Sequence, residues 1–149
     1  MIYTIDRELV VKRPISEVFE FFSDAFNLEA ITPPNVSFHV ITPPPIDLKA
    51  GALIDYKLRV NAIPLSWTTR IEVWNPPFGF SDIQLRGPYK LWHHTHTFVE
   101  TGDGTRMTDH VDYELPLGFL GDLAHRWWVR RDIEAIFAYR ESIIRDRFS

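Results

Sequence analysis

Two histidines, two positions apart, are the residues of this sequence best suited to carry out chemistry. His94 and His96 lie in the segment Leu91–Glu100, whose alternating residue types predict a β-strand. Side chains alternate between the two faces of a strand, so both histidines share a face with Trp92 and Phe98. These aromatic neighbours indicate that the shared face points into the protein. Because histidine titrates near neutral pH, an inward pair is suited to general acid–base catalysis.

The next predicted strand supplies a carboxylate that can pair with a histidine. The sequence Gly102-Asp103-Gly104 predicts a short turn, which makes Thr105–Leu115 the antiparallel neighbour of the histidine strand. A buried histidine needs a hydrogen-bond partner, since an unpaired polar group is costly in an apolar interior. If the inner face of 105–115 carries Asp109, that residue is the expected partner. The other residues on the same face are Met107, Val111 and Tyr113.

Three interpretations of His94, His96 and Asp109 fit this pattern. The first is a polar cluster that fixes the register of the strands and orients the wall of a cavity. The second is a catalytic base oriented by a carboxylate, although the pattern commits no residue to a catalytic role. The third is a metal site, because His-x-His and an aspartate can supply three ligands and leave one position open. Two histidines on one strand are a weak metal signal, so we expect no metal and no cofactor.

Composition and charge exclude several classes of function. The net charge is −4, the pI is about 5.8 and no basic run occurs, which argues against binding to nucleic acid. The absence of cysteine excludes disulfides and thiolate chemistry. The first residues do not resemble a signal peptide, and no apolar run approaches the roughly 20 residues that cross a bilayer. We therefore expect a soluble cytoplasmic protein without stable membrane insertion, and the sequence identifies no protein partner.

The predicted elements are those of a single α+β domain over residues 1–149. Apolar spacing predicts two short helices after the first strand, at 15–22 and 24–30, and a long helix near the C-terminus. Seven antiparallel strands with short connections expose an apolar face, so we expect a curved sheet wrapped around the long helix. The predicted strands are 3–11, 36–42, 53–60, 65–74, 80–85, 91–100 and 105–115.

The long helix, predicted for Leu117–Phe148, has an irregular apolar stripe. One apolar set is rotated by roughly 140° about the helix axis from the other. We interpret this offset as a bend near Trp128, and the alternative is a separate lid or rim formed by residues 118–128. His39, His110 and His125 are interpreted as isolated surface histidines. The first apolar set is Leu120, Leu123, Ala124 and Trp127, and the second is Val129, Ile133, Ile136, Phe137 and Ile144.

The order of these elements resembles a known fold superfamily, and several segments resemble it in sequence. The chain is similar to bacterial stand-alone members of the START/Bet v 1-like superfamily, also called SRPBCC, in its CoxG/polyketide-cyclase-like branch. The resemblance implies the helix-grip fold, with a cavity between sheet and long helix that holds an apolar or aromatic small molecule. The segments that carry it are PISEVFEFFSD (14–24), NLEAITPP (27–34), GPYKLWHHTHTF (87–98), GTRMTDHVDY (104–113), LPLG (115–118) and IFAYR (136–140).

The predicted ligand-binding residues combine strand alternation with this resemblance. Alternation directs one set of side chains inward from 53–60 and 65–74, namely Tyr56, Leu58, Val60, Trp67, Thr69, Ile71 and Val73. In 80–85 composition favours solvent exposure of Asp82 and Gln84, whereas the resemblance of the Phe80-x-Asp82-x-Gln84 motif implies that they face the ligand. The predicted ligand-binding set is Tyr56, Trp67, Phe80, Asp82, Gln84, Trp92, His94, His96, Asp109, Tyr113 and Phe137.

The expected function is the binding or transport of a small hydrophobic or amphipathic molecule, such as a lipid, an isoprenoid or a polyketide-like aromatic. One alternative is a cyclase or dehydratase that acts on a polyketide-like aromatic substrate. In that enzyme His94 or His96 is the base, and Asp109 or Asp82 orients it. A second alternative is a protein-interaction module whose core is filled and whose cavity is closed.

Overall fold

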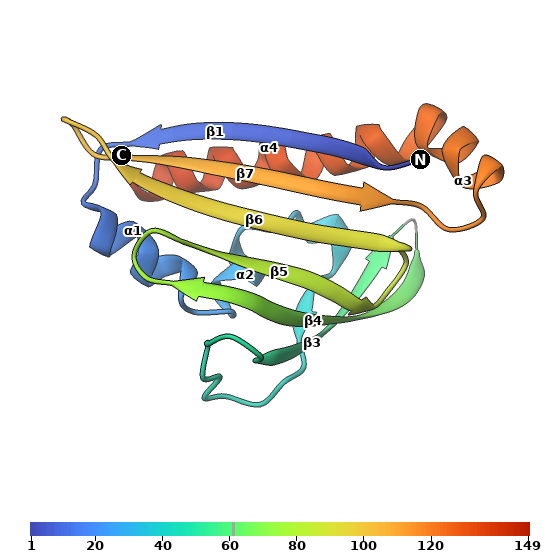
Figure 1. Cartoon of the computed structure of the whole chain (residues 1–149), viewed down its shortest axis with the longest axis horizontal. Coiled ribbons are helices and arrows are strands. Elements are labelled where there is room, and N and C mark those ends of the chain that lie inside the picture. The colour runs from blue at the N-terminus through green and yellow to red at the C-terminus, as the bar shows by residue number, and fades with distance from the viewer. Residues whose placement is uncertain (61) are drawn as a thin grey trace.

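One antiparallel sheet organises the computed structural model, which describes residues 1–60 and 62–149. Within those residues seven strands pair in the order β1-β7-β6-β5-β4-β3-β2. The sheet curves, so its concave face can enclose side chains from several strands (Figure 1). The strands are β1 (Tyr3–Val11), β2 (His39–Val40), β3 (Leu53–Val60), β4 (Ile63–Asn75), β5 (Gly79–Arg86), β6 (Leu91–Glu100) and β7 (Thr105–Glu114).

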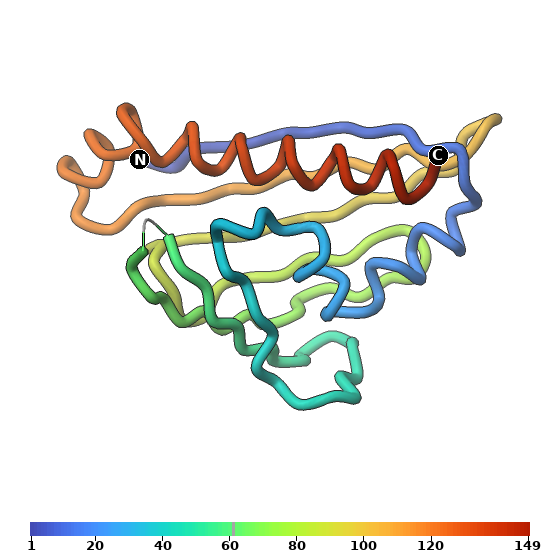
Figure 2. Tube along the Cα trace, turned by 180° about the vertical axis from the view of Figure 1, so that it is seen from behind, coloured from blue at the N-terminus to red at the C-terminus, as the bar shows by residue number. Residues whose placement is uncertain are grey.

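Helices cover the concave face of this sheet from both ends of the chain. Figure 2 shows α4 along β1 and β7, with the segment that contains α1 and α2 across the remaining strands on the same side. This is the helix-grip arrangement that the element order predicted, and the prediction is confirmed. The helices are α1 (Ile15–Phe22), α2 (Asn27–Ala30), the 3-10 turn η1 (Pro34–Val36), α3 (Phe119–Ala124), the π-helical turn η2 (His125–Val129) and α4 (Arg130–Arg147).

Two predicted elements are shorter in the structure than the sequence indicated. The strand predicted at 36–42 is reduced to His39–Val40, because Pro34–Val36 forms a 3-10 turn and Ser37 then adopts a left-handed conformation with φ of 49°. The helix predicted at 24–30 begins only at Asn27. The Asp24 carboxylate accepts a hydrogen bond from the amide of Phe26 (2.9 Å), and this local turn competes with a helical start.

A β-bulge reverses the inside–outside alternation in β4. The register against β5 shifts between Ile71 and Val73, so the prediction that Val73 faces inward is wrong. Val73 is 55% exposed, whereas the following Trp74 packs inside against Phe19, with ring centroids 5.2 Å apart. Strict alternation along one strand cannot anticipate the extra residue of a bulge.

The irregular stripe of the long helix has a specific structural cause. α3 and α4 are joined without a break through the π-helical turn His125–Val129, whose wider turn rotates the residues before it relative to those after it. Ile133 and Phe137, from the second apolar set, are buried against the sheet. Leu120 and Trp127, from the first set, are each 61% exposed and do not share that face.

His125 is buried, which corrects its interpretation as a surface histidine. Its ring stacks on Tyr3 with centroids 3.5 Å apart, and its Nε2 is 2.6 Å from the hydroxyl of Tyr113. A second link between sheet and helix is the two-bond ion pair of Arg7 in β1 with Glu141 in α4, at 2.8 and 3.1 Å. These contacts fix the helix along the sheet at two separate points.

Neighbouring residues of β6 test the assignment of its inner face. Phe98 is 2% exposed and packs against the rings of Phe19 and Phe22, whereas Val99 is 39% exposed. Phe98→Ala should lower the free energy of unfolding by about 3–5 kcal/mol, because it leaves a void in the core. Val99→Ala should cost about 1 kcal/mol or less. Urea denaturation measures both, and equal losses would contradict the assignment.

Candidate functional site

An apolar cavity of about 220 Å³ lies between the concave face of the sheet and the helices that cover it. Its walls come from β3–β6, from α1 and α2 with the segment that follows them, and from α4. Ile136, Phe137 and Arg140 supply the wall on the side of α4. The cavity lies where the bent sheet is too wide for one helix to fill.

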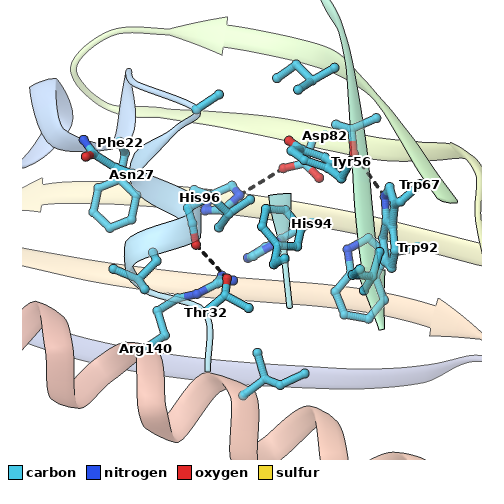
Figure 3. A pocket seen from close by; sticks show the side chains of 18 of the residues that line it. Phe22, Asn27, Thr32, Tyr56, Trp67, Asp82, Trp92, His94, His96 and Arg140 are labelled. Atoms are coloured by element: carbon cyan, nitrogen blue, oxygen red, sulfur yellow. Dashed lines mark hydrogen bonds and ion pairs between the residues drawn. The ribbon is translucent and has the colours of Figure 1, made fainter. Parts of the chain in front are cut away.

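Most of the predicted ligand-binding residues line this cavity, as Figure 3 shows for several of them. They project from four adjacent strands and from α4. Strand alternation pointed to residues of β3, β4 and β6, whereas the resemblance implied the position of Asp82. The predicted residues on the wall are Tyr56, Trp67, Phe80, Asp82, Trp92, His94, His96 and Phe137.

Three predicted residues, Gln84, Asp109 and Tyr113, lie outside the cavity wall in the described part of the chain. The amide group of Gln84 donates to the carbonyl of Tyr89 (2.7 Å) and accepts from the amide of Tyr89 (3.1 Å), so it holds the β5–β6 connection. Tyr113 bonds to His125 beneath the helix. Asp109 stands behind the histidines and contacts them directly, as described below.

Three aromatic side chains form one wall of the cavity. The rings of Trp67 and Trp92 meet edge to face, with centroids 5.4 Å apart, and Tyr89 packs against both at 5.6 and 4.8 Å. The indole N–H of Trp67 donates to Thr69 (3.1 Å), so its polar atom is satisfied and its face remains apolar. Sequence reasoning missed Tyr89, because it lies in the connection between strands, where alternation gives no signal.

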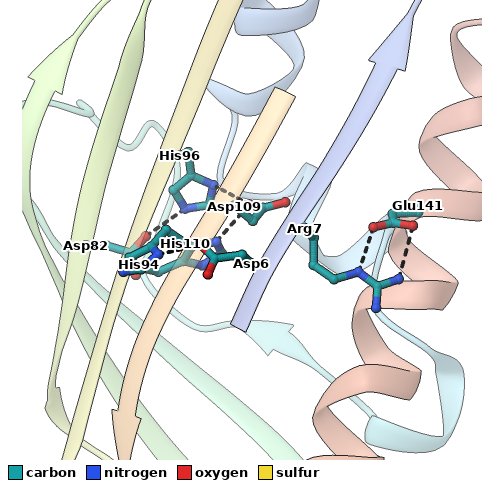
Figure 4. A network of polar contacts seen from close by, with 8 residues as sticks. All are labelled: Asp6, Arg7, Asp82, His94, His96, Asp109, His110 and Glu141. Atoms are coloured by element: carbon teal, nitrogen blue, oxygen red, sulfur yellow. Dashed lines mark hydrogen bonds and ion pairs between the residues drawn. The ribbon is translucent and has the colours of Figure 1, made fainter. Parts of the chain in front are cut away.

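Beside the aromatic residues, on the same face of the sheet, lies a cluster of two histidines and two aspartates, of which Asp109 stands behind the cavity wall (Figure 4). His94 Nε2 lies 2.8 Å from Asp109 Oδ1, and His96 Nε2 lies 3.0 Å from Asp82 Oδ2. His96 Nδ1 is also 3.3 Å from Asp109 Oδ1. The direct cross-strand partners are instead Asp82 with His94 and His96 with Asp109, so the two shortest contacts run diagonally across the strands.

Ring stacking fixes the orientation of both imidazoles. His96 lies between Phe80, at a centroid distance of 4.1 Å, and His94, at 3.7 Å. Phe137 of α4 closes the other side of His94 with its ring 5.7 Å away. Each histidine is therefore held by a carboxylate at its edge and by rings on its faces.

The two histidines differ in their affinity for a proton. Burial and the neighbouring charge of His96 lower the pKa of His94 below its ordinary value of 6.5, although Asp109 opposes this shift. Burial also disfavours the charged form of His96, but its hydrogen bonds to Asp109 and Asp82 outweigh burial and raise its pKa. Burial alone would raise the pKa of both carboxyls, yet contacts with the histidines hold the pKa values of Asp82 and Asp109 below their ordinary range.

These shifts give the two rings opposite preferences. Two carboxylates favour the imidazolium form of His96, whereas burial favours the neutral imidazole of His94. A carboxylate only accepts, so His94 Nε2 carries the hydrogen that it donates to Asp109, and Nδ1 is left as the basic atom. No hydrogen bond engages His94 Nδ1 within residues 1–60 and 62–149. A neutral imidazole that lines an apolar cavity can accept a proton from a bound molecule.

The cluster contains the residue types of a metal site, but its imidazole rings are not oriented to share an ion. One ligand atom each from Asp82, His94 and His96 lie within 4.8 Å of one another. However, the imidazole rings are stacked 3.7 Å apart with their planes only 27° from parallel. An ion about 2.1 Å from one ring nitrogen, in the plane of that ring, would lie well out of the plane of the other. The sequence suggested Asp109 as the third possible ligand beside His94 and His96, whereas the structure places Asp82 in that position.

Arg140 is a positively charged residue on the cavity wall that the sequence analysis missed. It projects from α4 toward the histidine side of the cavity (Figure 3). The signal was present, because Arg140 falls on the helical face defined by Ile133, Phe137 and Ile144, at steps of three and four residues. Because the apolar residues of this face are buried, an arginine on the same face is expected to point inward as well, which is unusual for a charged residue.

Comparison with known proteins identifies the family. Residues 3–138 match the family model described as "Polyketide cyclase / dehydrase and lipid transport". The chain belongs to this family. The predicted relationship to the START/Bet v 1-like, or SRPBCC, superfamily is thereby confirmed. No curated protein matches the chain in sequence.

Solved structures from bacteria and plants share the fold of this family member over nearly its whole length. The Zhui aromatase/cyclase from Streptomyces sp. R1128 superposes with a TM-score of 0.76 at 14% identity, covering 99% of this chain and 93% of that one. Protein TTHA0849 from Thermus thermophilus gives 0.74 at 18% identity, with 99% and 100% covered. The major latex-like protein 151 of Panax ginseng gives 0.73 at 12% identity, with 100% and 99% covered. Among the helices formed by the described residues, none is both long and apolar enough to span a membrane.

Asp109 provides a test of the charge assignment. We expect the NMR titration midpoint of His96 to lie above 6.5 and that of His94 to lie below it. Asp109→Asn removes the negative charge that favours both imidazolium forms, so both midpoints should fall. Because the pKa of Asp109 is lowered in the folded protein, its carboxylate stabilises the folded state at pH values above the pKa that Asp109 has in the unfolded chain. The substitution should therefore cost about 1–3 kcal/mol of unfolding free energy at neutral pH.

The control for this experiment is Asp112→Asn in the same strand. Asp112 accepts a hydrogen bond from Thr4 and contacts His110 on the outer face of the sheet. This variant should leave the titrations of His94 and His96 unchanged. A His94 midpoint above that of His96 in the wild-type protein would refute the assignment.

Proposed function

We propose that this protein binds a small hydrophobic or amphipathic molecule, with an aromatic or alicyclic body, in the cavity between sheet and α4. The observation that carries the proposal is the apolar cavity of about 220 Å³ with a polar cluster on one wall. Protein interiors are normally packed without voids of this size, because unfilled volume forfeits favourable contacts. A void of about 150 Å³ is enough to take up benzene, so this one suits a molecule of one or two rings.

The distribution of polarity also supports a small amphipathic ligand. Trp67, Tyr89 and Trp92 offer ring faces and edges, while the neighbouring His94 and, from α4, Arg140 offer polar atoms. Apolar burial supplies affinity at about 25 cal/mol per Å², and a few polar groups fix the orientation of the ligand. The family description includes lipid transport, which agrees with such a role.

Binding of 1-naphthamide, a neutral two-ring probe, tests this function. Calorimetry should give a Kd at or below about 1 mM for the wild-type protein. Ile136→Trp places a larger ring on the cavity wall and should weaken binding at least about tenfold, because the probe and the indole compete for the same volume. Ala135→Trp, at the exposed neighbouring position, is the matched control and should bind normally.

The natural ligand can be sought in the same preparation. Native mass spectrometry of the freshly purified protein should show a mass excess that disappears on denaturation, and solvent extraction should release the molecule. If 1-naphthamide does not bind, or binds equally well to Ile136→Trp, the cavity is not the site and the proposal fails.

A second candidate function is proton transfer from the bound molecule, as in a cyclase or dehydratase. The observation in its favour is the neutral imidazole of His94 on the cavity wall, oriented by Asp109 at 2.8 Å. In this reaction Nδ1 removes a proton from the carbon next to a carbonyl group, and the C–H electron pair moves into the enolate. The matching fold of the Zhui aromatase/cyclase agrees with such chemistry without establishing it for this chain.

Hydrogen–deuterium exchange in 1-acetylnaphthalene tests the second function. Deuterium entry at the methyl group in D₂O, followed by NMR, should fall about a hundredfold or more in His94→Gln, because the base is lost. The wild-type rate should rise with pH and level off above the pKa of His94, with a midpoint below 6.5. His93→Gln, on the other face of β6, is the control. Equal exchange in both variants would eliminate His94 as the base.

A further inference from the structure

Arg140 carries a charge into the cavity without a protein partner for it. Its Nε is fully buried and has no hydrogen-bond partner within the described residues. In the same part of the chain, neither a hydrogen bond nor an ion pair engages its terminal nitrogens. The contact that the guanidinium does make is with the ring of Phe137, whose centroid lies 5.2 Å away. The group therefore has donors to offer on the cavity wall.

An unpaired cation of this kind is costly. Moving a charged donor out of water without a new acceptor forfeits its hydration, and buried groups in native proteins are almost always paired. Burial lowers the pKa of Arg140, while the charges of Asp109 and Asp82 oppose that shift from a distance. Neither carboxylate forms an ion pair with Arg140 in the described part of the chain, and both contact the histidines instead. Long-range attraction thus keeps the guanidinium charged without using its hydrogen-bond donors.

Arg7 provides a comparison, because it is an arginine with a structural ion pair. Arg7 also points into the interface of sheet and helix, and there it makes two hydrogen bonds to Glu141, the residue that follows Arg140. Of the lysines and arginines that the structure describes, Arg140 is the one that lines the cavity. Its free donors are consequently placed where a bound molecule can reach them.

We propose that Arg140 is an anion subsite of the cavity and that the bound molecule carries a carboxylate on its ring system. The planar guanidinium matches the two oxygens of a carboxylate in a paired arrangement of hydrogen bonds. The apolar walls accept the ring, and the carboxylate lies toward α4 and Arg140. This inference rests on the proposed binding function and adds the chemical class of the ligand.

The competing explanation is that Arg140 only balances the charge of the cluster. With His96 protonated, the two carboxylates leave that cluster one negative charge in excess, and a nearby guanidinium compensates for it. If this were its whole role, removal of the charge would alter stability and the histidine titrations. The affinity for an anionic ligand would then change no more than the affinity for a neutral one.

A matched pair of probes separates the two explanations. 1-Naphthoate and 1-naphthamide have the same ring and nearly the same shape, and only the former is an anion at neutral pH. Calorimetry should show that the wild-type protein binds 1-naphthoate about ten- to a hundredfold more tightly than 1-naphthamide. Arg140→Met keeps much of the length and apolar surface of the side chain and should abolish that preference, because the affinity for 1-naphthoate should fall much further than the affinity for 1-naphthamide. Arg140→Lys should restore part of it.

The control variant is Arg131→Met, which removes an exposed arginine from the same helix and should keep the full preference. Equal affinity of the wild-type protein for the two probes would overturn the subsite and leave the cavity function intact. The subsite would also be overturned if Arg140→Met kept the wild-type preference for 1-naphthoate over 1-naphthamide. If neither probe binds the wild-type protein, the binding function itself fails and the subsite fails with it. Should Arg140→Met not fold, the wild-type comparison alone decides.

Discussion

The ionic contact of His96 with Asp82 and Asp109 is the interaction on which the arrangement of the cavity depends. It joins β5, β6 and β7 on their inner face, where each member alone would be a costly buried polar group. Because Asp109 is shared, the same contact also sets the ring orientation of His94 and the nitrogen that it leaves free. One buried polar cluster therefore organises both the structure of the wall and the position of the free nitrogen of His94.

The width of the sheet is the second constraint, and it explains why a cavity exists. α4 lies along β1 and β7, where Ile133 and Phe137 fill the core, and the remaining strands curve away from it (Figures 1 and 2). The segment from α1 to η1 covers those strands on the same face of the sheet as α4. The space between the two coverings is bounded by large aromatic residues rather than filled by them.

Much of this arrangement could be predicted from the sequence, because it depends on local periodicity. The period of two in β6 correctly directed His94 and His96 inward, and the turn at Gly102–Gly104 correctly aligned Asp109 with them. The inward position of Trp74 could not be predicted, since a bulge depends on pairing between strands. Arg140 was missed for another reason: its helical position was readable, but the inward face of the helix was defined by apolar residues alone.

The backbone pairing of the seven strands has a consequence for how such proteins diverge. Each strand is held by main-chain hydrogen bonds, which any side chain leaves in place, and alternate positions face the cavity. Inner residues can therefore be exchanged during evolution without loss of the ladder, while outer residues change independently. This separation accounts for folds that coincide along their whole length at 12–18% identity. The lining of the cavity can therefore change while the backbone that encloses it is retained.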